Sequence, residues 1–197
     1  FLMMVTEMIR PKRILELGTF TGYSAVCLAS CLPEGGHLDT IEINDELEDL
    51  ILEGFGRAGL SDRITLHIGD CKKILGMLRS RLLCPEAAGE DVNPDGTDAG
   101  TCPGGLYDMV YMDANKREYP EYYDLVFDLV RPGGYILADN VLWDGKVYED
   151  EVPSDRQTQG IVRFNDKVAS DPRVECVIVP MRDGLYLIRR KDGLTAL

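Results

Sequence analysis

Carboxylate side chains follow five successive apolar runs of this chain, at or next to the point where each run ends. They are Glu16, Glu42, Asp70, Asp113 and Asp139. Aspartate and glutamate commonly cap the next helix, so each of them taken singly also has a purely structural interpretation. If the runs are parallel strands of one sheet, all five carboxylates lie on one edge and repel one another. We therefore expect a cationic ligand or a metal ion to compensate that repulsion.

The first of these runs leads into a glycine turn. The apolar stretch 14–17 is followed by the turn Gly18–Gly22 and by a helical pattern over 23–32, which is typical of the first unit of a doubly wound sheet. A dinucleotide fingerprint requires glycine where this chain has Phe20, so that the backbone can approach a pyrophosphate. The bulk of Phe20 and the negative charge of Glu16 suit a cationic ligand better than a phosphate.

Two further groups of residues extend this candidate site. Glu42 lies about 20 residues beyond the turn, where an acidic residue typically binds ribose hydroxyls. Asp113, Asp139 and Asn140 offer three oxygen ligands at the ends of two strands, which suits Mg²⁺. Asn140 also has a simpler interpretation as a turn residue.

The elements that position these residues alternate along the chain. We expect strands at 14–17, 37–43, 63–68, 107–112 and 135–138, and helices at 1–9, 23–32, 45–58, 72–81, 119–130 and 159–170. Residues 145–158 are polar and loop-like, and strands at 174–179 and 185–190 are joined by a hairpin turn. The order predicts an α/β fold with a doubly wound, mostly parallel seven-stranded sheet and a C-terminal antiparallel hairpin.

Composition predicts one domain spanning residues 1–197, because 45% of the 197 residues are hydrophobic. The net charge of −13 disfavours a nucleic-acid partner, and no apolar run approaches the ~20 residues of a membrane span. Residues 85–105 are rich in Gly, Pro, Asp and Ala, which predicts a surface insertion. The helix at 1–9 has no N-terminal cap, so we expect a further segment upstream of it.

The six cysteines include no Cys-x-x-Cys pair, and the chain has only two histidines, so a zinc site has little support. We expect reduced thiols and a cytoplasmic protein. A disulfide between Cys84 and Cys102, which flank the predicted insertion, is the alternative.

Four segments of the chain resemble one known family. They are Glu-Leu-Gly-Thr-Phe-Thr-Gly-Tyr-Ser at 16–24, Met-Asp-Ala-Asn-Lys at 112–116, Gly-Gly-Tyr-Ile-Leu-Ala-Asp-Asn-Val-Leu-Trp-Asp-Gly at 133–145 and Asp-Gly-Leu-Tyr-Leu-Ile-Arg-Arg at 183–190. In order and content they are similar to the divalent-metal-dependent O-methyltransferases of the caffeoyl-CoA and catechol type, which are class I S-adenosylmethionine enzymes. This resemblance covers about residues 1–191 apart from the insertion and implies a Rossmann-like methyltransferase fold.

The resemblance also implies roles for individual residues. The positions matching the S-adenosylmethionine site are Glu16, Gly18, Thr19, Phe20, Gly22, Ser24, Glu42, Ile43, Asp70, Cys71 and Asp113. Asp113, Asp139 and Asn140 match the ligands of Mg²⁺ or another divalent cation such as Mn²⁺ or Ca²⁺. Lys116, with Asp113, matches the catalytic positions, and Asn115, Lys116 and Trp143 match the substrate side. Asn115 stands where plant members have a second aspartate. An exposed helix-start lysine and a core tryptophan are the simpler interpretations of Lys116 and Trp143.

The resulting hypothesis is methyl transfer from S-adenosylmethionine to one of two adjacent hydroxyls of a small phenol, by a homodimer in the cytoplasm. Three alternatives remain open. One is methylation of a hydroxylated base in transfer RNA, which the acidic charge disfavours. Another is a nicotinamide-dependent dehydrogenase, against which Phe20 argues. The last is a cofactor-binding relative without catalysis.

Overall fold

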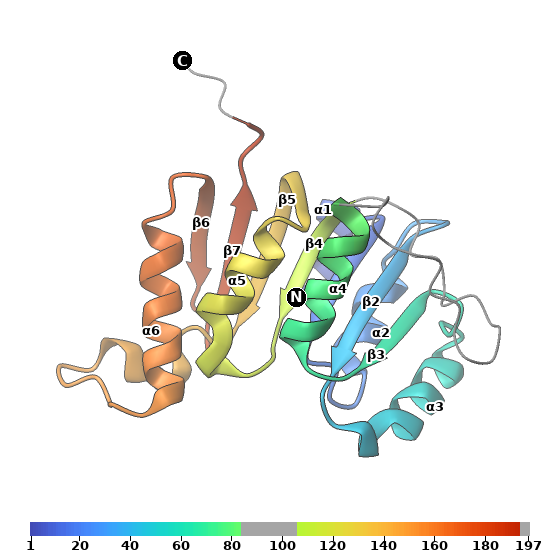
Figure 1. Cartoon of the computed structure of the whole chain (residues 1–197), viewed down its shortest axis with the longest axis horizontal. Coiled ribbons are helices and arrows are strands. Elements are labelled where there is room, and N and C mark those ends of the chain that lie inside the picture. Colours follow the sequence, from blue (N-terminus) through green and yellow to red (C-terminus); the bar gives the residue numbers. More distant parts are fainter. Residues whose placement is uncertain (84–105, 194–197) are drawn as a thin grey trace.

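The computed structural model describes residues 1–83 and 106–193, which form one seven-stranded sheet with helices on both faces (Figure 1). The strands follow the order β3-β2-β1-β4-β5-β7-β6. Their bounds are β1 Arg13–Leu17, β2 His37–Glu42, β3 Ile64–Ile68, β4 Tyr107–Met112, β5 Val130–Asp139, β6 Val174–Val179 and β7 Leu185–Arg190. Neighbours from β3 to β5 are parallel, and β7 runs antiparallel to both β5 and β6. The predicted fold class is confirmed.

Helices α1, α2 and α3 cover one face of the sheet, and α4, α5 and α6 cover the other (Figure 1). The α-helices are α1 Leu2–Ile9, α2 Tyr23–Ser30, α3 Glu48–Ala58, α4 Cys71–Leu83, α5 Tyr119–Phe127 and α6 Arg156–Ala169. Short 3₁₀ helices lie at η1 Asp45–Leu47, η3 Lys116–Glu118 and η4 Trp143–Tyr148. Within the two described ranges, no helix is long and apolar enough to cross a membrane.

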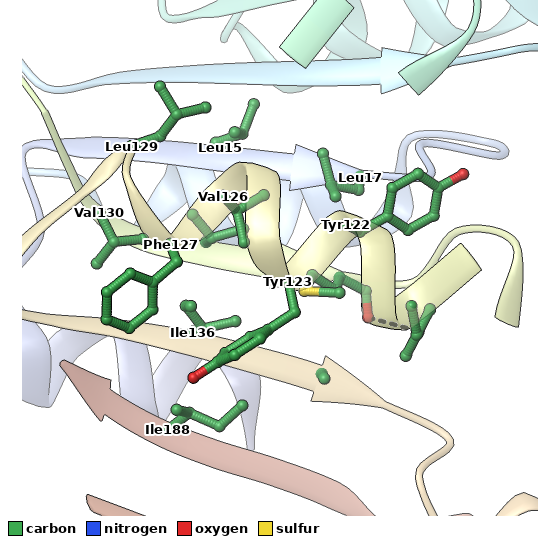
Figure 2. Packing of buried hydrophobic residues seen from close by; sticks show 14 of the residues in the cluster. Leu15, Leu17, Tyr122, Tyr123, Val126, Phe127, Leu129, Val130, Ile136 and Ile188 are labelled. Atoms are coloured by element: carbon green, nitrogen blue, oxygen red, sulfur yellow. Dashed lines mark hydrogen bonds between the residues drawn. The ribbon is translucent and has the colours of Figure 1, made fainter. Parts of the chain in front are cut away.

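A buried cluster lies on each face of the sheet because successive side chains of a strand point to opposite faces. Leu15 and Leu17 belong to the cluster beneath α5, whereas Ile14, the residue before Leu15, belongs to the cluster beneath α2 and α3. Figure 2 shows Tyr123 and Val126 of α5 packed in the first of these clusters. Two fully buried clusters hold the strand ends in a fixed register, which is what a site built on those ends requires.

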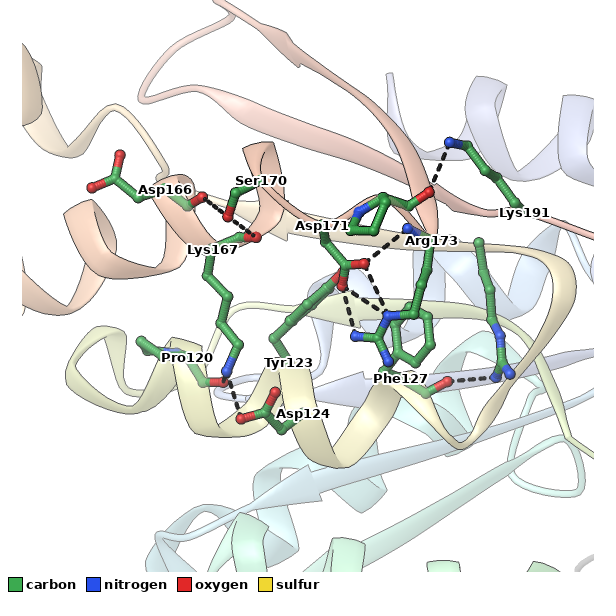
Figure 3. A network of polar contacts seen from close by, with 12 residues as sticks. Pro120, Tyr123, Asp124, Phe127, Asp166, Lys167, Ser170, Asp171, Arg173 and Lys191 are labelled. Atoms are coloured by element: carbon green, nitrogen blue, oxygen red, sulfur yellow. Dashed lines mark hydrogen bonds and ion pairs between the residues drawn. The ribbon is translucent and has the colours of Figure 1, made fainter. Parts of the chain in front are cut away.

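Polar contacts join α5 to α6 and to the segment that follows α6 (Figure 3). The Asp171 carboxylate accepts hydrogen bonds from the Tyr123 hydroxyl at 3.0 Å and from the Arg173 guanidinium at 2.6 Å. These hydrogen bonds lower the pKa of Asp171 to about 2, and the bond from Arg173 has the largest effect. Lys167 of α6 pairs with Asp124 of α5 at 2.6 Å. The two helices are therefore tied to each other as well as to the sheet.

Helix boundaries before β5 differ from the prediction. The helix predicted over 45–58 begins with the 3₁₀ turn η1, and it ends at Gly59, a C-cap in the left-handed conformation at φ 69°. The helix predicted over 119–130 ends at Phe127 instead. Val130 pairs with Tyr107 of β4, so the sheet takes it as the first residue of β5.

The segment predicted as a loop over 145–158 holds most of η4 and the first turn of α6. Helix α6 begins at Arg156 rather than at Gln159. Its cap is Asp155, whose carboxylate accepts hydrogen bonds from the backbone N–H groups of Gln157 and Thr158, both at 3.0 Å. An aspartate before a helix is an ordinary start signal, and the sequence analysis overlooked this one.

The predicted insertion at 85–105 and the alternative Cys84–Cys102 pair lie outside the described residues. Inside the described ranges, the cysteines are free thiols: Cys27, Cys31, Cys71 and Cys176.

Gly160 sets how closely α6 approaches η3, and we expect its replacement by alanine to destabilise the protein by about 1–3 kcal/mol. A Cβ there would lie 2.8 Å from the Cα of Arg117 and closer still to the carbonyl oxygen of Lys116. Both obstacles are backbone, so α6 would have to move. Chemical denaturation measures the change. The control is Gly76→Ala on α4, where a Cβ meets nothing within 4 Å, so helix propensity should stabilise the variant by about 0.5–1 kcal/mol. Equal stabilities for the two variants would contradict this account.

Candidate active site

The turn after β1 lies where the strand order reverses, between β1 and β4. Gly18 has φ +92°, and a Cβ at this position would lie 2.5 Å from the carbonyl oxygen of Asp113. Only glycine therefore lets the two strand ends approach this closely. Ligands of doubly wound sheets bind at such a reversal.

A cavity of about 620 Å³ opens at this reversal. Among the described residues that line it, the charged ones are all carboxylates: Glu42, Asp70, Asp113 and Glu118. This lining repels phosphates and attracts a cation. The predicted cofactor residues that line the cavity are Gly18, Thr19, Phe20, Ser24, Glu42, Ile43, Asp70, Cys71 and Asp113. Gly22 is buried as the cap residue before α2, and Glu16 lies beneath the turn; neither lines the cavity.

Two backbone groups hold the Glu42 carboxylate in position. The N–H of Phe20 donates to Oε2 at 2.7 Å, and the N–H of Asn44 donates to Oε1 at 2.9 Å. Each oxygen keeps a further acceptor site, because an ionised carboxylate has about four. A ligand diol therefore meets an acceptor pair whose orientation is already set.

Glu16 is fully buried and belongs to a chain of hydrogen bonds between two strands. The Thr40 hydroxyl on β2 donates to its Oε2 at 2.5 Å and lies 2.6 Å from the Thr19 hydroxyl in the turn. Burial raises the pKa of Glu16 to about 7, although hydrogen bonds from Ser24 and Thr40 oppose the rise. Its other oxygen, Oε1, is buried without a hydrogen-bond partner in the part of the chain described. This oxygen lies beneath the turn and outside the lining of the cavity, so Glu16 acts on the site through the turn that it supports.

We expect Glu16 to make the ligand-free protein less stable as the pH rises from about 4.5 to about 7. Over that range the folded state keeps a proton that the unfolded state has released, so the free energy of unfolding falls with pH. The pKa rise corresponds to about 3 kcal/mol. Urea unfolding between these pH values measures the slope, which Glu16→Gln should remove and the surface control Glu53→Gln should keep. An unchanged slope in Glu16→Gln would contradict the prediction.

The predicted metal ligands lie at the ends of β4 and β5, which are adjacent in the sheet. The Asp139 carboxylate accepts hydrogen bonds from the Tyr111 hydroxyl and from the Asn140 N–H, both at 2.8 Å. Burial raises the pKa of Asp113; the positive charge of Lys116 opposes this rise and the charge of Asp139 adds to it. The described residues contain no group of three His, Cys, Asp or Glu side chains suited to a metal, so a metal site here would need the Asn140 amide as its third donor. An all-oxygen donor set with two neighbouring carboxylates fits a hard divalent cation.

Lys116 is buried, with 7% of its surface exposed, so its interpretation as an exposed helix-start lysine is wrong. Its ammonium donates to Asp113 Oδ1 at 2.5 Å and to the Tyr119 hydroxyl at 2.7 Å. That hydroxyl in turn lies 2.9 Å from the carbonyl oxygen of Met112 and 3.1 Å from that of Asp139. The amine is thus held between the two strands that carry the carboxylates.

A second cavity of about 1030 Å³ adjoins the first, and the Tyr111 side chain lines both. Asp139 and Asn140 line the second cavity, whereas Asp113 lines the first. The candidate metal ligands therefore lie at the boundary, where a group from each cavity could meet. Tyr111 was not among the predicted site residues, although strand alternation places it on the same face as Asp113 two residues later.

The remaining predicted substrate residues lie to the side of this boundary. Asn115 lines the smaller cavity, and its side chain also caps η3 by accepting from the Arg117 N–H. Trp143 is half-buried against the α5-side cluster and lines neither cavity. Its indole N–H is buried without a hydrogen-bond partner among the described residues. The core interpretation of Trp143 thus matches its position.

Comparison with known proteins places this geometry among methyl-transferring enzymes. The family model described as O-methyltransferase matches residues 1–86 and 97–191. Caffeoyl-CoA O-methyltransferase 2 of Populus trichocarpa is 33% identical over an alignment of 198 positions, which covers 96% of this chain and 71% of that protein. Catechol O-methyltransferase of Niastella koreensis is 33% identical over 181 residues, covering 92% of this chain and 72% of that protein.

Solved structures agree with the sequence comparison. An O-methyltransferase of Bacillus cereus in complex with SAH superimposes with a TM-score of 0.81 at 28% identity, covering 97% of this chain and 79% of that one. TomG of Streptomyces achromogenes, an O-methyltransferase in complex with SAM, gives a TM-score of 0.79 at 29% identity, covering 96% and 78%.

Proposed function

The chain belongs to the O-methyltransferase family and is an S-adenosylmethionine-dependent enzyme, and we propose that it methylates one hydroxyl of a small ortho-diphenol. The observation that carries the proposal is the pair of adjoining cavities with carboxylates at their boundary. The names of the two relatives, a caffeoyl-CoA and a catechol O-methyltransferase, support acceptors with two adjacent hydroxyls. Membership of the O-methyltransferase family excludes the alternative of a nicotinamide-dependent dehydrogenase.

The smaller cavity would hold S-adenosylmethionine. Its carboxylates complement a ligand with a sulfonium and an ammonium group, and Gly18 leaves room for the ligand against the backbone. Glu42 would accept hydrogen bonds from both ribose hydroxyls, and Asp70 and Cys71 would lie beside the adenine. When bound, this cofactor supplies a methyl group already activated by positive sulfur, so the protein mainly has to align the reacting atoms.

Glu42→Ala should weaken S-adenosylmethionine binding by roughly 10- to 100-fold, because charge-assisted hydrogen bonds are lost. The variant also removes the acceptor for the Phe20 and Asn44 N–H groups, so the turn loses its anchor. Isothermal titration calorimetry gives the affinity. Glu46→Ala, an exposed acidic change in η1, is the matched control. Unchanged affinity in Glu42→Ala would contradict the assignment of this residue.

Asp113, Asp139 and Asn140 would hold Mg²⁺ or another divalent cation at the boundary of the two cavities. When bound, the cation supplies positive charge that favours ionisation of an acceptor hydroxyl. Tyr111 and the Asn140 N–H keep the Asp139 carboxylate oriented, and Tyr119 keeps the Lys116 amine beside Asp113. Lys116, when neutral, would accept the hydroxyl proton at Nζ. An acceptor with two adjacent oxygens would occupy both sides of the boundary.

A methylation assay with and without Mg²⁺ tests the proposal. With S-adenosylmethionine present, catechol should be methylated and phenol should not, because phenol has a single oxygen to place at the boundary. Equal rates on the two acceptors would contradict the diphenol assignment. Transfer to an RNA substrate in place of catechol would move the protein to the alternative acceptor class.

We further propose a single catalytic domain that acts as a homodimer in the cytoplasm. Free thiols in the described part of the chain support the reducing compartment. Size-exclusion chromatography with light scattering tests the dimer.

A further inference from the structure

The larger cavity combines three kinds of surface. Asp139 and Asn140 supply carboxylate and amide oxygens to its lining, which also includes the exposed side chains of Tyr23 and Tyr148. The cation among its described lining residues is Arg182. An acceptor that fills this cavity therefore meets oxygen ligands, aromatic rings and one guanidinium.

Arg182 is free to bind a ligand. The guanidinium takes part in no hydrogen bond or ion pair with any described residue. Asp139, Asp144 and Asp183 line the same cavity, so the guanidinium also offsets a local excess of negative charge. An anionic group entering elsewhere in this cavity would meet carboxylates, whereas beside Arg182 it would meet a charge-assisted donor pair.

The backbone at Arg182 is strained in a way that glycine would relieve. Arg182 has φ 56° and is the first central residue of the turn from Met181 to Gly184, which is closed by a 3.0 Å hydrogen bond. Of the two central residues only Arg182 has positive φ, which is the type II′ arrangement that normally takes glycine there. Strained backbone persists where the surroundings over-determine it, and it concentrates at functional sites.

The turn is joined firmly to the loop that carries Asn140. The N–H of Val141 donates to the carbonyl of Gly184 at 3.1 Å, and that of Leu142 donates to the carbonyl of Asp183 at 2.9 Å. The Asp183 carboxylate also accepts from the Asp144 N–H. The turn that carries Arg182 and the loop that follows Asn140 therefore belong to one hydrogen-bonded frame.

We propose that Arg182 is a specificity-determining residue that selects ortho-diphenols bearing a carboxylate, whose charge its guanidinium pairs while the diphenol oxygens lie at Asp139 and Asn140. This inference rests on the proposed function. It assigns the acceptor class as aromatic acids with two adjacent hydroxyls, in preference to neutral catechols.

The test compares acids with their neutral esters. The acceptors are 3,4-dihydroxybenzoate and 3,4-dihydroxycinnamate, which place the carboxylate at two distances from the hydroxyls, and the methyl ester of each. The readout is the ratio of kcat/KM for acid to that for ester, since a general loss of activity cancels in this ratio. We expect kcat/KM to be about tenfold higher for at least one acid than for its ester. This is the low end of the effect of a hydrogen bond to a charged group, because the Arg182 side chain is exposed to solvent. The preference should shrink as salt is raised.

Two variants connect the preference to the residue. Arg182→Gly, which the positive φ favours, should bring the ratio close to one, and Arg182→Lys should keep part of the preference. Arg57→Gln, which removes one positive charge from the exposed face of α3, should keep the wild-type ratio. A wild-type ratio of one or less for both acids, or an unchanged preference in Arg182→Gly, would overturn the inference.

Equilibrium dialysis separates this inference from the proposed function. If no diphenol is methylated, the proposed function fails, yet binding of 3,4-dihydroxybenzoate and of its ester can still be compared in wild type and Arg182→Gly. Tighter binding of the acid that disappears in Arg182→Gly supports the role of Arg182. Equal binding of acid and ester by wild type refutes it.

Discussion

Replacing Lys116 by alanine should lower the turnover number by roughly 10²- to 10⁴-fold, the range of a lost general base, while S-adenosylmethionine affinity is preserved. The expectation follows from position: the buried Lys116 amine lies 2.5 Å from the carboxylate of Asp113, which lines the smaller cavity, and 2.7 Å from the Tyr119 hydroxyl. Glu42 and the glycine turn, which would hold the cofactor, do not contact this amine. Steady-state kinetics and calorimetry on one preparation measure both quantities.

Lys116 also neutralises Asp113, so a structural effect has to be separated from proton transfer. Lys116→Met keeps the aliphatic stem, which packs near the Tyr119 ring with Nζ 4.8 Å from its centroid, and removes only the amine. If Lys116 accepts the proton, Lys116→Met should lower the turnover number as far as Lys116→Ala does. The control is Lys167→Ala, which removes a lysine paired with Asp124 on the far helices. A wild-type rate in Lys116→Met would leave no role for the amine.

The fold was predictable because its signals are local. Each strand is a short apolar run ended by a turn residue, and Gly18 separates β1 from α2 within a few positions. The common edge of the carboxylates followed from the same signals, since parallel strands end on one side of a sheet. The predicted helix boundary was wrong where strand pairing outweighed the local sequence pattern. Val130 continues a helical pattern, but it belongs to β5 and pairs with Tyr107 of β4.

The chemical state of the site residues was less predictable because it depends on tertiary packing. Every residue of β1 is buried, and nothing in the local sequence says that the Glu16 carboxylate lies beneath the turn with a pKa near 7 instead of in the cavity. Tyr111 and Tyr119 likewise look like core aromatics, and only the fold brings their hydroxyls to Asp139 and Lys116. Arg182 was not predicted as a site residue. Its positive φ is imposed by the hairpin turn, and an arginine in the sequence does not indicate that conformation.

Removing divalent cations should abolish turnover and spare S-adenosylmethionine binding, because the cavity that would hold the cofactor has its own carboxylate in Glu42. The reason lies in the charges at the boundary. Asp139 is close enough to Asp113 that its charge adds to the rise in the pKa of Asp113, and the single positive charge of Lys116 cannot balance two carboxylates. A chelator should therefore stop methyl transfer, and added Mg²⁺ should restore it. Full activity in excess chelator would remove the cation from the mechanism.

Stability offers a second measurement that does not depend on catalysis. A ligand that binds only the folded state stabilises it by about 2.7 kcal/mol at a concentration 100 times its Kd. Mg²⁺ should accordingly raise the melting temperature of the wild type but not that of Asp139→Asn, which keeps the shape of the side chain and loses its charge. Asp144→Asn is the matched control: Asp144 lines the same cavity at φ 55°, which asparagine tolerates, and lies outside the donor set. Equal stabilisation of Asp139→Asn and wild type would show that the cation binds elsewhere, because Asp139, held in place by Tyr111 and the Asn140 N–H, is a proposed ligand at this boundary.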